Sequence, residues 1–200
     1  MIFQKKYSHE NIFQFYFDMK MLKIFLLGII SGFPWVLIGS CLSLWLKEEG
    51  LSRSTIGWSG LIFAVYAVNY LWAPLVDRLK IPWLTMKIGH RKSWIFIMQI
   101  LICICLIFWN MFDPNENLFL IILFGLIIAL CSATQDITID ALRIEQINPE
   151  NKQSMAAGAS VAVIGWWTGF KFGGLISLLI SDYFNNLGFK NYWGITFSFL

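Results

Sequence analysis

Two aspartates and an arginine lie close together in the otherwise apolar string CSATQDITIDALRIE at residues 131–145. Asp136, Asp140 and Arg143 follow one another at spacings of four and three, which places them on one face of a helix. Two carboxylates this close resist ionising together, so one of them can hold a proton near neutral pH. The pattern fits proton exchange in a membrane carrier. It fits equally a structural ion pair in which Arg143 fixes Asp140 one turn away.

Lys171 is the other charge inside an apolar stretch, GWWTGFKFGG. A charge at membrane depth costs at least ~2.5 kcal/mol, so it is a functional candidate by default. Counting from the predicted helix ends puts Lys171 about 24 Å deep and Asp136 about 9 Å deep, so we do not expect them to pair. A cation near the midplane suits an anionic solute. The alternative is that its ammonium group extends outward to the interface.

Metal or enzyme chemistry is a weaker interpretation of the same carboxylates. Asp136 and Asp140 could hold Mg²⁺ in an intramembrane transferase, but such sites need several oxygen ligands. Asp77 and Asp182 stand alone, so the sequence offers no second acidic cluster. The four cysteines lie in apolar runs and behave there as small hydrophobic residues. We therefore predict no metal, no cofactor and no enzymatic activity.

The composition decides which solvent surrounds these charges. Of the 200 residues, 58% are hydrophobic and only 14% are charged, whereas a soluble domain is about 25% charged. Lipid must therefore cover much of the surface. The ten tryptophans suit a protein with two membrane interfaces. A net charge of +3 is too small to indicate a nucleic-acid partner.

The apolar runs predict an all-α membrane protein, because about 20 apolar residues cross a hydrocarbon core. Residues 1–20 are predicted to be a cytoplasmic leader that does not span the membrane. Residues 21–200 then form one transmembrane domain. Its predicted spans are 22–46, 55–76, 94–112, 118–140, 155–181 and an incomplete sixth at 192–200.

The positions of the basic residues predict the orientation. Eleven of the fifteen lysines and arginines fall in the N-terminal segment and in the second and fourth connections, and three fall in the connections on the opposite side. Because cytoplasmic loops carry the excess of Lys and Arg, we expect these eleven residues and the N-terminus to be cytoplasmic.

Two sets of glycines are candidates for helix packing. Gly165, Gly169 and Gly173 are spaced by four, and Gly28 and Gly32 repeat this spacing in the first span. Small residues at this spacing let two helix backbones approach closely.

The second connection, WAPLVDRLKIPWLTMKIGHRKSW, carries Asp77 and Arg78 at one end and Gly89, Arg91 and Lys92 at the other. This arrangement resembles the cytoplasmic signature of major facilitator transporters. The resemblance implies that these five residues form a cytoplasmic gate.

The strings SGFPWVLIGSCLSLWLKEEGLSRSTIG, YLWAPLVDR, GHRKSW and CSATQDITIDALRIE, in this order, resemble the AmpG family of muropeptide permeases. The resemblance implies a twelve-helix major facilitator fold, of which this chain holds the N-terminal six-helix half with its sixth helix truncated. It also implies proton-driven import of anhydro-muropeptides across the bacterial inner membrane. Acetyl-CoA transporters share two of the motifs, so another anionic solute stays open.

Transport in this fold takes place between two halves. We therefore expect that this chain alone does not transport, and that it joins a second half-transporter or self-associates. A non-transporting remnant, or a partner of a longer paralogue, is the alternative. The expected partners are the lipid bilayer and a small anionic, muropeptide-like solute.

Overall fold

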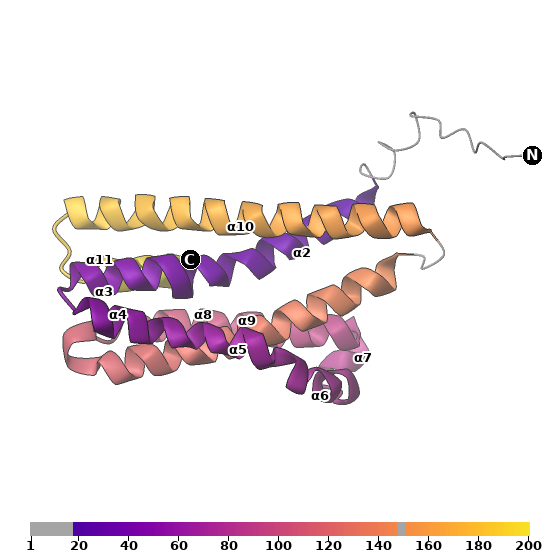
Figure 1. Ribbon diagram of the computed structural model, residues 1–200, viewed down its shortest axis with the longest axis horizontal. Coiled ribbons are helices and arrows are strands. Elements are labelled where there is room, and N and C mark those ends of the chain that lie inside the picture. Colours follow the sequence, from indigo (N-terminus) through magenta and orange to yellow (C-terminus); the bar gives the residue numbers. More distant parts are fainter. Residues whose placement is uncertain (1–17, 148–150) are drawn as a thin grey trace, which may run out of the picture.

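The computed structural model describes residues 18–147 and 151–200, and every regular element within these ranges is a helix (Figure 1). Four helices there are long and apolar enough to cross a membrane: Met19–Glu48, His90–Trp109, Pro114–Gln146 and Lys152–Asn186. The all-α membrane class predicted from composition is therefore confirmed. Residues 1–17 of the predicted leader lie outside the described residues, and Asp18 caps the first helix by accepting a hydrogen bond from the Lys20 N–H.

The first long helix is continuous but changes geometry after its proline. It comprises α2 (Met19–Val36), a π-helical turn η1 (Leu37–Cys41) and α3 (Leu42–Glu48). Pro34 has no backbone N–H to complete the helical ladder. The π turn begins three residues later, and single π turns of this kind inside α-helices are frequent at functional sites.

The predicted second span, 55–76, is divided into short pieces rather than forming one helix. The pieces are α4 (Arg53–Ser59), η2 (Gly60–Phe63), α5 (Ala64–Val68), η3 (Asn69–Leu71) and α6 (Ala73–Arg78). Gly57 and Gly60 weaken the helix locally. Pro74 occupies the first turn of α6, where its missing N–H costs nothing. Hydropathy alone does not detect these backbone interruptions.

The remaining helices extend beyond the predicted spans. After the short α7 (Leu84–Ile88), α8 (His90–Trp109) begins directly after Gly89, four residues earlier than predicted. The helix α9 (Pro114–Gln146) continues six residues past the predicted end, and α10 (Lys152–Asn186) is longer at both ends. The residues at these helix ends are polar, so hydropathy does not detect them, but many of them have a good intrinsic helix propensity. Asp136 thus lies ten residues from the end of α9, and the last six of these extend past the predicted span.

The helices α2 and α10 run side by side in the same direction (Figure 1). A Cβ atom on Gly28 would lie 3.0 Å from the Cα of Gly165, and one on Gly32 would overlap the backbone of Trp166. Gly169 meets the backbone of Ile29 in the same way. Two backbones can approach this closely only where no side chain separates them.

Gly173 faces the Phe33 ring, further along the same two helices. The structure therefore places all five predicted packing glycines, Gly28, Gly32, Gly165, Gly169 and Gly173, at the contact between α2 and α10.

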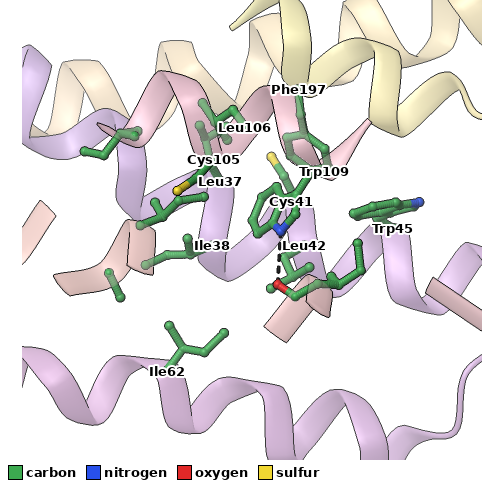
Figure 2. Close-up of a cluster of buried hydrophobic side chains, with 14 of the residues drawn as sticks. Leu37, Ile38, Cys41, Leu42, Trp45, Ile62, Cys105, Leu106, Trp109 and Phe197 are labelled. Carbon is green, nitrogen blue, oxygen red and sulfur yellow. Dashed lines mark hydrogen bonds between the residues drawn. The ribbon is translucent and has the colours of Figure 1, made fainter. Parts of the chain in front are cut away.

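The main apolar core gathers buried side chains from the first long helix, η2, α8, α9 and α11 (Tyr192–Phe199), and Figure 2 shows part of it. Trp45, Trp109 and Phe197 are fully buried there, with their rings 4.7–6.1 Å apart. The Trp109 indole satisfies its N–H by donating to the carbonyl of Ile121 at 3.0 Å. Phe197 belongs to α11, the eight-residue helix that corresponds to the predicted incomplete span.

Candidate functional site

Asp136 is held at the contact between α9 and α2. The Ser31 hydroxyl donates to Asp136 Oδ1 at 2.5 Å, and both side chains are largely removed from the surface. Ser31 lies next to Gly32, so the close approach of α10 on one side of α2 leaves the serine side chain directed toward α9. The structure thus gives Asp136 a partner in the first helix that its own helix could not supply.

Aromatic rings from four helical segments, α2, η2, α5 and α10, gather beside this pair. Trp35, one turn after Ser31, has its ring centroid 4.3 Å from that of Tyr66, 4.9 Å from Phe63 and 5.6 Å from Trp166. The Trp35 indole N–H lies near the Asp136 carboxylate without forming a hydrogen bond of normal geometry. These rings are tilted or edge-on to Trp35 and form an apolar wall next to a carboxylate.

Within residues 18–147 and 151–200, three buried polar atoms in this cluster have no hydrogen-bond partner of normal geometry: Trp35 Nε1, Tyr66 Oη and Ser132 Oγ. Ser132 precedes Asp136 by one helical turn and is completely buried, and Tyr66 lies close to it. Buried polar groups are nearly always paired. Tyr66 lies near Ser132 and Trp35 lies near Asp136, so small shifts can pair them with each other, and a bound water or solute can pair them as well. Together with Asp136 they can donate to, and accept from, a polar solute.

Asp140 and Arg143 pair with each other and not with Asp136. Arg143 donates from Nη2 and Nε to Asp140 Oδ1 at 3.1 and 3.2 Å. The Asp140 side chain is 67% exposed. The three residues share a helix face, as their spacing predicts. The two carboxylates differ, however: Asp140 is the one that pairs with Arg143, and Asp136 is the one that is buried.

Lys171 lies on an exposed face of α10, outside the Asp136 cluster. Its Nζ is 5.7 Å from the Trp167 ring centroid and 5.9 Å from that of Phe170, in reach of cation–π attraction. Within residues 18–147 and 151–200 no carboxylate forms an ion pair with it. Its charge is therefore available to a group outside the described chain.

The predicted gate residues divide into two groups. Arg91, at the start of α8, pairs with Asp77 at the end of α6 and donates from Nε to Glu145 Oε1 of α9 at 3.0 Å. Glu145 was not among the predicted gate residues, although it lies in the same string as Asp136.

The other three gate candidates lie outside this network. Arg78 and Lys92 are exposed, and Lys92 lines a groove of about 520 Å³ between α2, α8 and α9. Gly89 has φ +92°, a conformation that L side chains rarely adopt, and it lets α8 start abruptly after the connection.

Sequence reasoning missed Ser31, Trp35, Tyr66 and Ser132. Ser132 could have been found, because it precedes Asp136 by four residues on the same face. The other three are neutral residues in apolar helices, and Ser31 is 105 residues from Asp136 along the chain. Nothing in the local sequence indicates such a contact.

Comparison with known proteins shows the family of this chain. Residues 24–200 match the model of the Major Facilitator Superfamily. The chain belongs to the major facilitator superfamily. It is therefore a multi-pass membrane protein of a transporter family, as the resemblance in the basic connection implied.

Individual relatives confirm the AmpG-like resemblance. The AmpG 4 protein of Rickettsia conorii is 35% identical over 180 residues, which are 90% of this chain and 41% of that relative. The AmpG 1 protein of Rickettsia felis is 33% identical over 181 residues, 90% of this chain and 40% of the relative. The anhydromuropeptide permease of Escherichia coli strain K12 is 31% identical over 171 residues, 85% of this chain and 33% of the relative. The chain spans about two fifths of the first two relatives and a third of the last.

Proposed function

We propose that this chain forms one wall of a proton-coupled pathway that carries an anionic, muropeptide-like solute across the bacterial inner membrane. The observation that carries the proposal is the cluster around Asp136. A carboxylate at membrane depth, bonded to Ser31 and surrounded by unpartnered donors, is costly unless it binds something.

Asp136 is the proposed proton carrier. Protonation removes its negative charge and turns one carboxylate oxygen into a donor. The contact with Ser31 then changes with each proton bound, and with it the contact between α2 and α9. A ligand that binds two arrangements differently shifts their populations, which is what coupling requires.

The proposed solute contacts are Trp35, Tyr66 and Ser132. Lys171, which lies outside this cluster on the exposed face of α10, is the proposed cation. The three unpartnered groups suit acceptor oxygens on the solute, and the aromatic wall suits a flat apolar face. Muropeptide is the first candidate because the Escherichia coli relative is named an anhydromuropeptide permease. An acetyl-CoA-type anion is the second, since the same motifs resemble those transporters.

The network of Asp77, Arg91 and Glu145 is the proposed gate, because it joins the ends of three helical segments through one guanidinium group. Asp140 and Arg143 are proposed to lie where the pathway opens to water. The basic residues at this end suggest that it is cytoplasmic, together with the N-terminus.

The test uses a chimera, in which residues 1–200 precede the remaining length of the Rickettsia conorii relative. Cells that lack their own permease express the chimera and receive labelled anhydro-muropeptide. In membrane vesicles prepared from these cells, unlabelled acetyl-CoA is added as a competitor. We expect uptake that collapses when the proton gradient is dissipated. Asp136→Asn should reduce it at least about 100-fold, whereas Asp140→Asn should reduce it less, because Asp140 is nearer water.

Wild-type uptake by Asp136→Asn would leave only a structural role for the carboxylate. Uptake of labelled acetyl-CoA by the vesicles, without uptake of muropeptide, would favour the second solute. The chain expressed alone, at matched membrane levels, measures whether one wall suffices.

A further inference from the structure

The connection between α6 and α8 exposes large apolar side chains beside cations. Trp83 is 62% exposed and Met86 is 82% exposed. Leu79 and Ile88 are exposed as well. Isolated exposed apolar residues are common, but four within ten residues form a patch.

Hydrogen bonds hold the backbone of this connection, and they fix Trp83 in its exposed position. Trp83 has φ 65° and ψ −48°, and the Leu84 N–H donates to the Pro82 carbonyl at 2.7 Å, which closes a γ-turn around the tryptophan. The Thr85 hydroxyl accepts from the Ile81 N–H at 3.0 Å. A strained residue persists only when its surroundings fix it, and such positions are often functional.

The connection is also tied to α8. The Trp94 indole donates to the Leu79 carbonyl at 2.9 Å, and a ring nitrogen of His90 lies 3.0 Å from the Val76 carbonyl. Both ends of the patch are thus fixed to the bundle.

Four cations surround this apolar patch: Arg78, Lys80, Lys87 and Lys92, all exposed. In the described ranges none of them forms an ion pair, since the adjacent Asp77 is bound by Arg91. Lys87 instead places Nζ 3.9 Å from the centroid of the Trp83 ring. The patch therefore combines uncompensated positive charge with an exposed aromatic ring.

We propose that residues 78–92 bind anionic phospholipid at the membrane surface. Tryptophan is the residue that membrane interfaces favour, and clusters of Lys and Arg beside a membrane helix attract anionic headgroups. Trp83, Met86 and Leu79 enter the boundary between headgroups and acyl chains, and the cations contact the headgroup phosphates. Figure 1 places α6 and α7 near the end of the bundle where α9 ends, as an interfacial position requires.

The occupant is a lipid surface rather than a second protein. A protein partner that covered four unpaired cations would have to supply carboxylates to all of them. An anionic leaflet supplies negative charge over the whole patch at once. This binding does not depend on the proposed transport activity. It adds a lipid contact next to the Asp77–Arg91–Glu145 network.

The test uses the full chain labelled with 5-fluorotryptophan in nanodiscs, made either of phosphatidylcholine or of an equal mixture with phosphatidylglycerol. Trp83→Phe identifies the ¹⁹F resonance of Trp83. Trp58→Phe identifies a matched control, since Trp58 is 72% exposed on α4 at the other end of the bundle. A lipid spin-labelled near its headgroup then broadens the resonances of residues at the interface.

We expect the spin-labelled lipid to broaden the Trp83 resonance about threefold more in the anionic discs than in the neutral ones. The broadening of the Trp58 resonance should be the same in the anionic and the neutral discs. Lys80→Gln with Lys87→Gln should abolish the difference at Trp83. The matched pair Lys47→Gln with Arg53→Gln, which removes the same charge at the other end, should leave it intact.

Three results would overturn the inference. The Trp83 resonance could respond only to a water-soluble gadolinium chelate, which would place it in water. It could be protected from both reagents, which would indicate burial against protein, including a second copy. It could respond equally in both lipids, which would remove the role of anionic headgroups.

Discussion

At the scale of single residues, the cluster around Asp136 contains one residue that the sequence marks as functional and several that it does not. Asp136 is conspicuous because a charge in an apolar run is costly. Ser31, Trp35 and Tyr66 are neutral and could as well be packing residues. Only the folded arrangement shows that the polar atoms of Trp35 and Tyr66 are buried without partners.

Tyr66→Phe separates a binding role from a packing role. Removing a buried hydroxyl that has no partner should leave stability unchanged or slightly improved. If the hydroxyl bonds the solute, the KM for uptake by the chimera should rise about fivefold to tenfold, which corresponds to one hydrogen bond of about 1 kcal/mol. Uptake kinetics and thermal unfolding in detergent measure the two effects.

Tyr192→Phe is the matched control for this variant. Its hydroxyl donates to Glu48 at 2.7 Å at the far end of the bundle. It should lose about 0.5–1.5 kcal/mol of stability with no change in KM. An unchanged KM in Tyr66→Phe as well would exclude its hydroxyl from the solute site.

At the scale of elements, hydropathy located the apolar stretches but not how the backbone runs through them. It indicated 55–76 as a single span, whereas Gly57, Gly60 and Pro74 lie in a series of short helices. It ended the fourth span at residue 140, whereas α9 continues as a polar helix to Gln146. A polar extension carries no hydropathy signal, and only the structure shows that it brings Glu145 of α9 beside Arg91 of α8.

The contact between α2 and α10 depends on the absence of a side chain at Gly32. Gly32→Ala should destabilise the fold by about 1–3 kcal/mol, because the added methyl group overlaps the Trp166 backbone. Gly57→Ala is the control, since its Cβ would meet nothing within 4 Å. It should be neutral or stabilising by about 0.5–1 kcal/mol. Equal unfolding temperatures for the two variants would contradict the close packing.

The Asp77–Arg91–Glu145 network should affect exchange between conformations more than folding. Arg91 is only 17% exposed but both carboxylates are about half exposed, so one pair is worth about 1 kcal/mol. Asp77→Ala should therefore shift the population of gated states about fivefold and slow the maximal uptake rate of the chimera. Its level in the membrane should stay near that of the wild type.

Lys92→Gln is the control for the gate, because Lys92 is exposed and unpaired in the part of the chain that the structure describes. It should leave the uptake rate unchanged. If Asp77→Ala instead disappears from the membrane, the network is a folding element and the gate proposal fails.

At the scale of the whole molecule, ordered motifs identified the family although they could not supply the tertiary contacts. The order of YLWAPLVDR, GHRKSW and the acidic string is a property of the whole chain, and the match over residues 24–200 agrees with it. The parallel pairing of α2 with α10 joins segments more than a hundred residues apart. Small residues spaced by four indicated that a close contact exists, but not which helix supplies the other side.

The orientation of the whole molecule is still a prediction from charge, and two exposed cations at opposite ends of the bundle test it. Arg53 begins α4, and Lys152 begins α10 (Figure 1). Because the excess of Lys and Arg faces the cytoplasm, Arg53→Cys should react with a membrane-impermeant maleimide in intact cells. Lys152→Cys should react only after the membrane is opened. Cys41, Cys105 and Cys131 are buried but Cys103 is exposed on α8, so both variants carry Cys103→Ser and the chain with Cys103→Ser alone gives the background. Reaction of Lys152→Cys in intact cells, with Arg53→Cys protected until lysis, would invert the orientation and place the Asp77–Arg91–Glu145 network at the outer face.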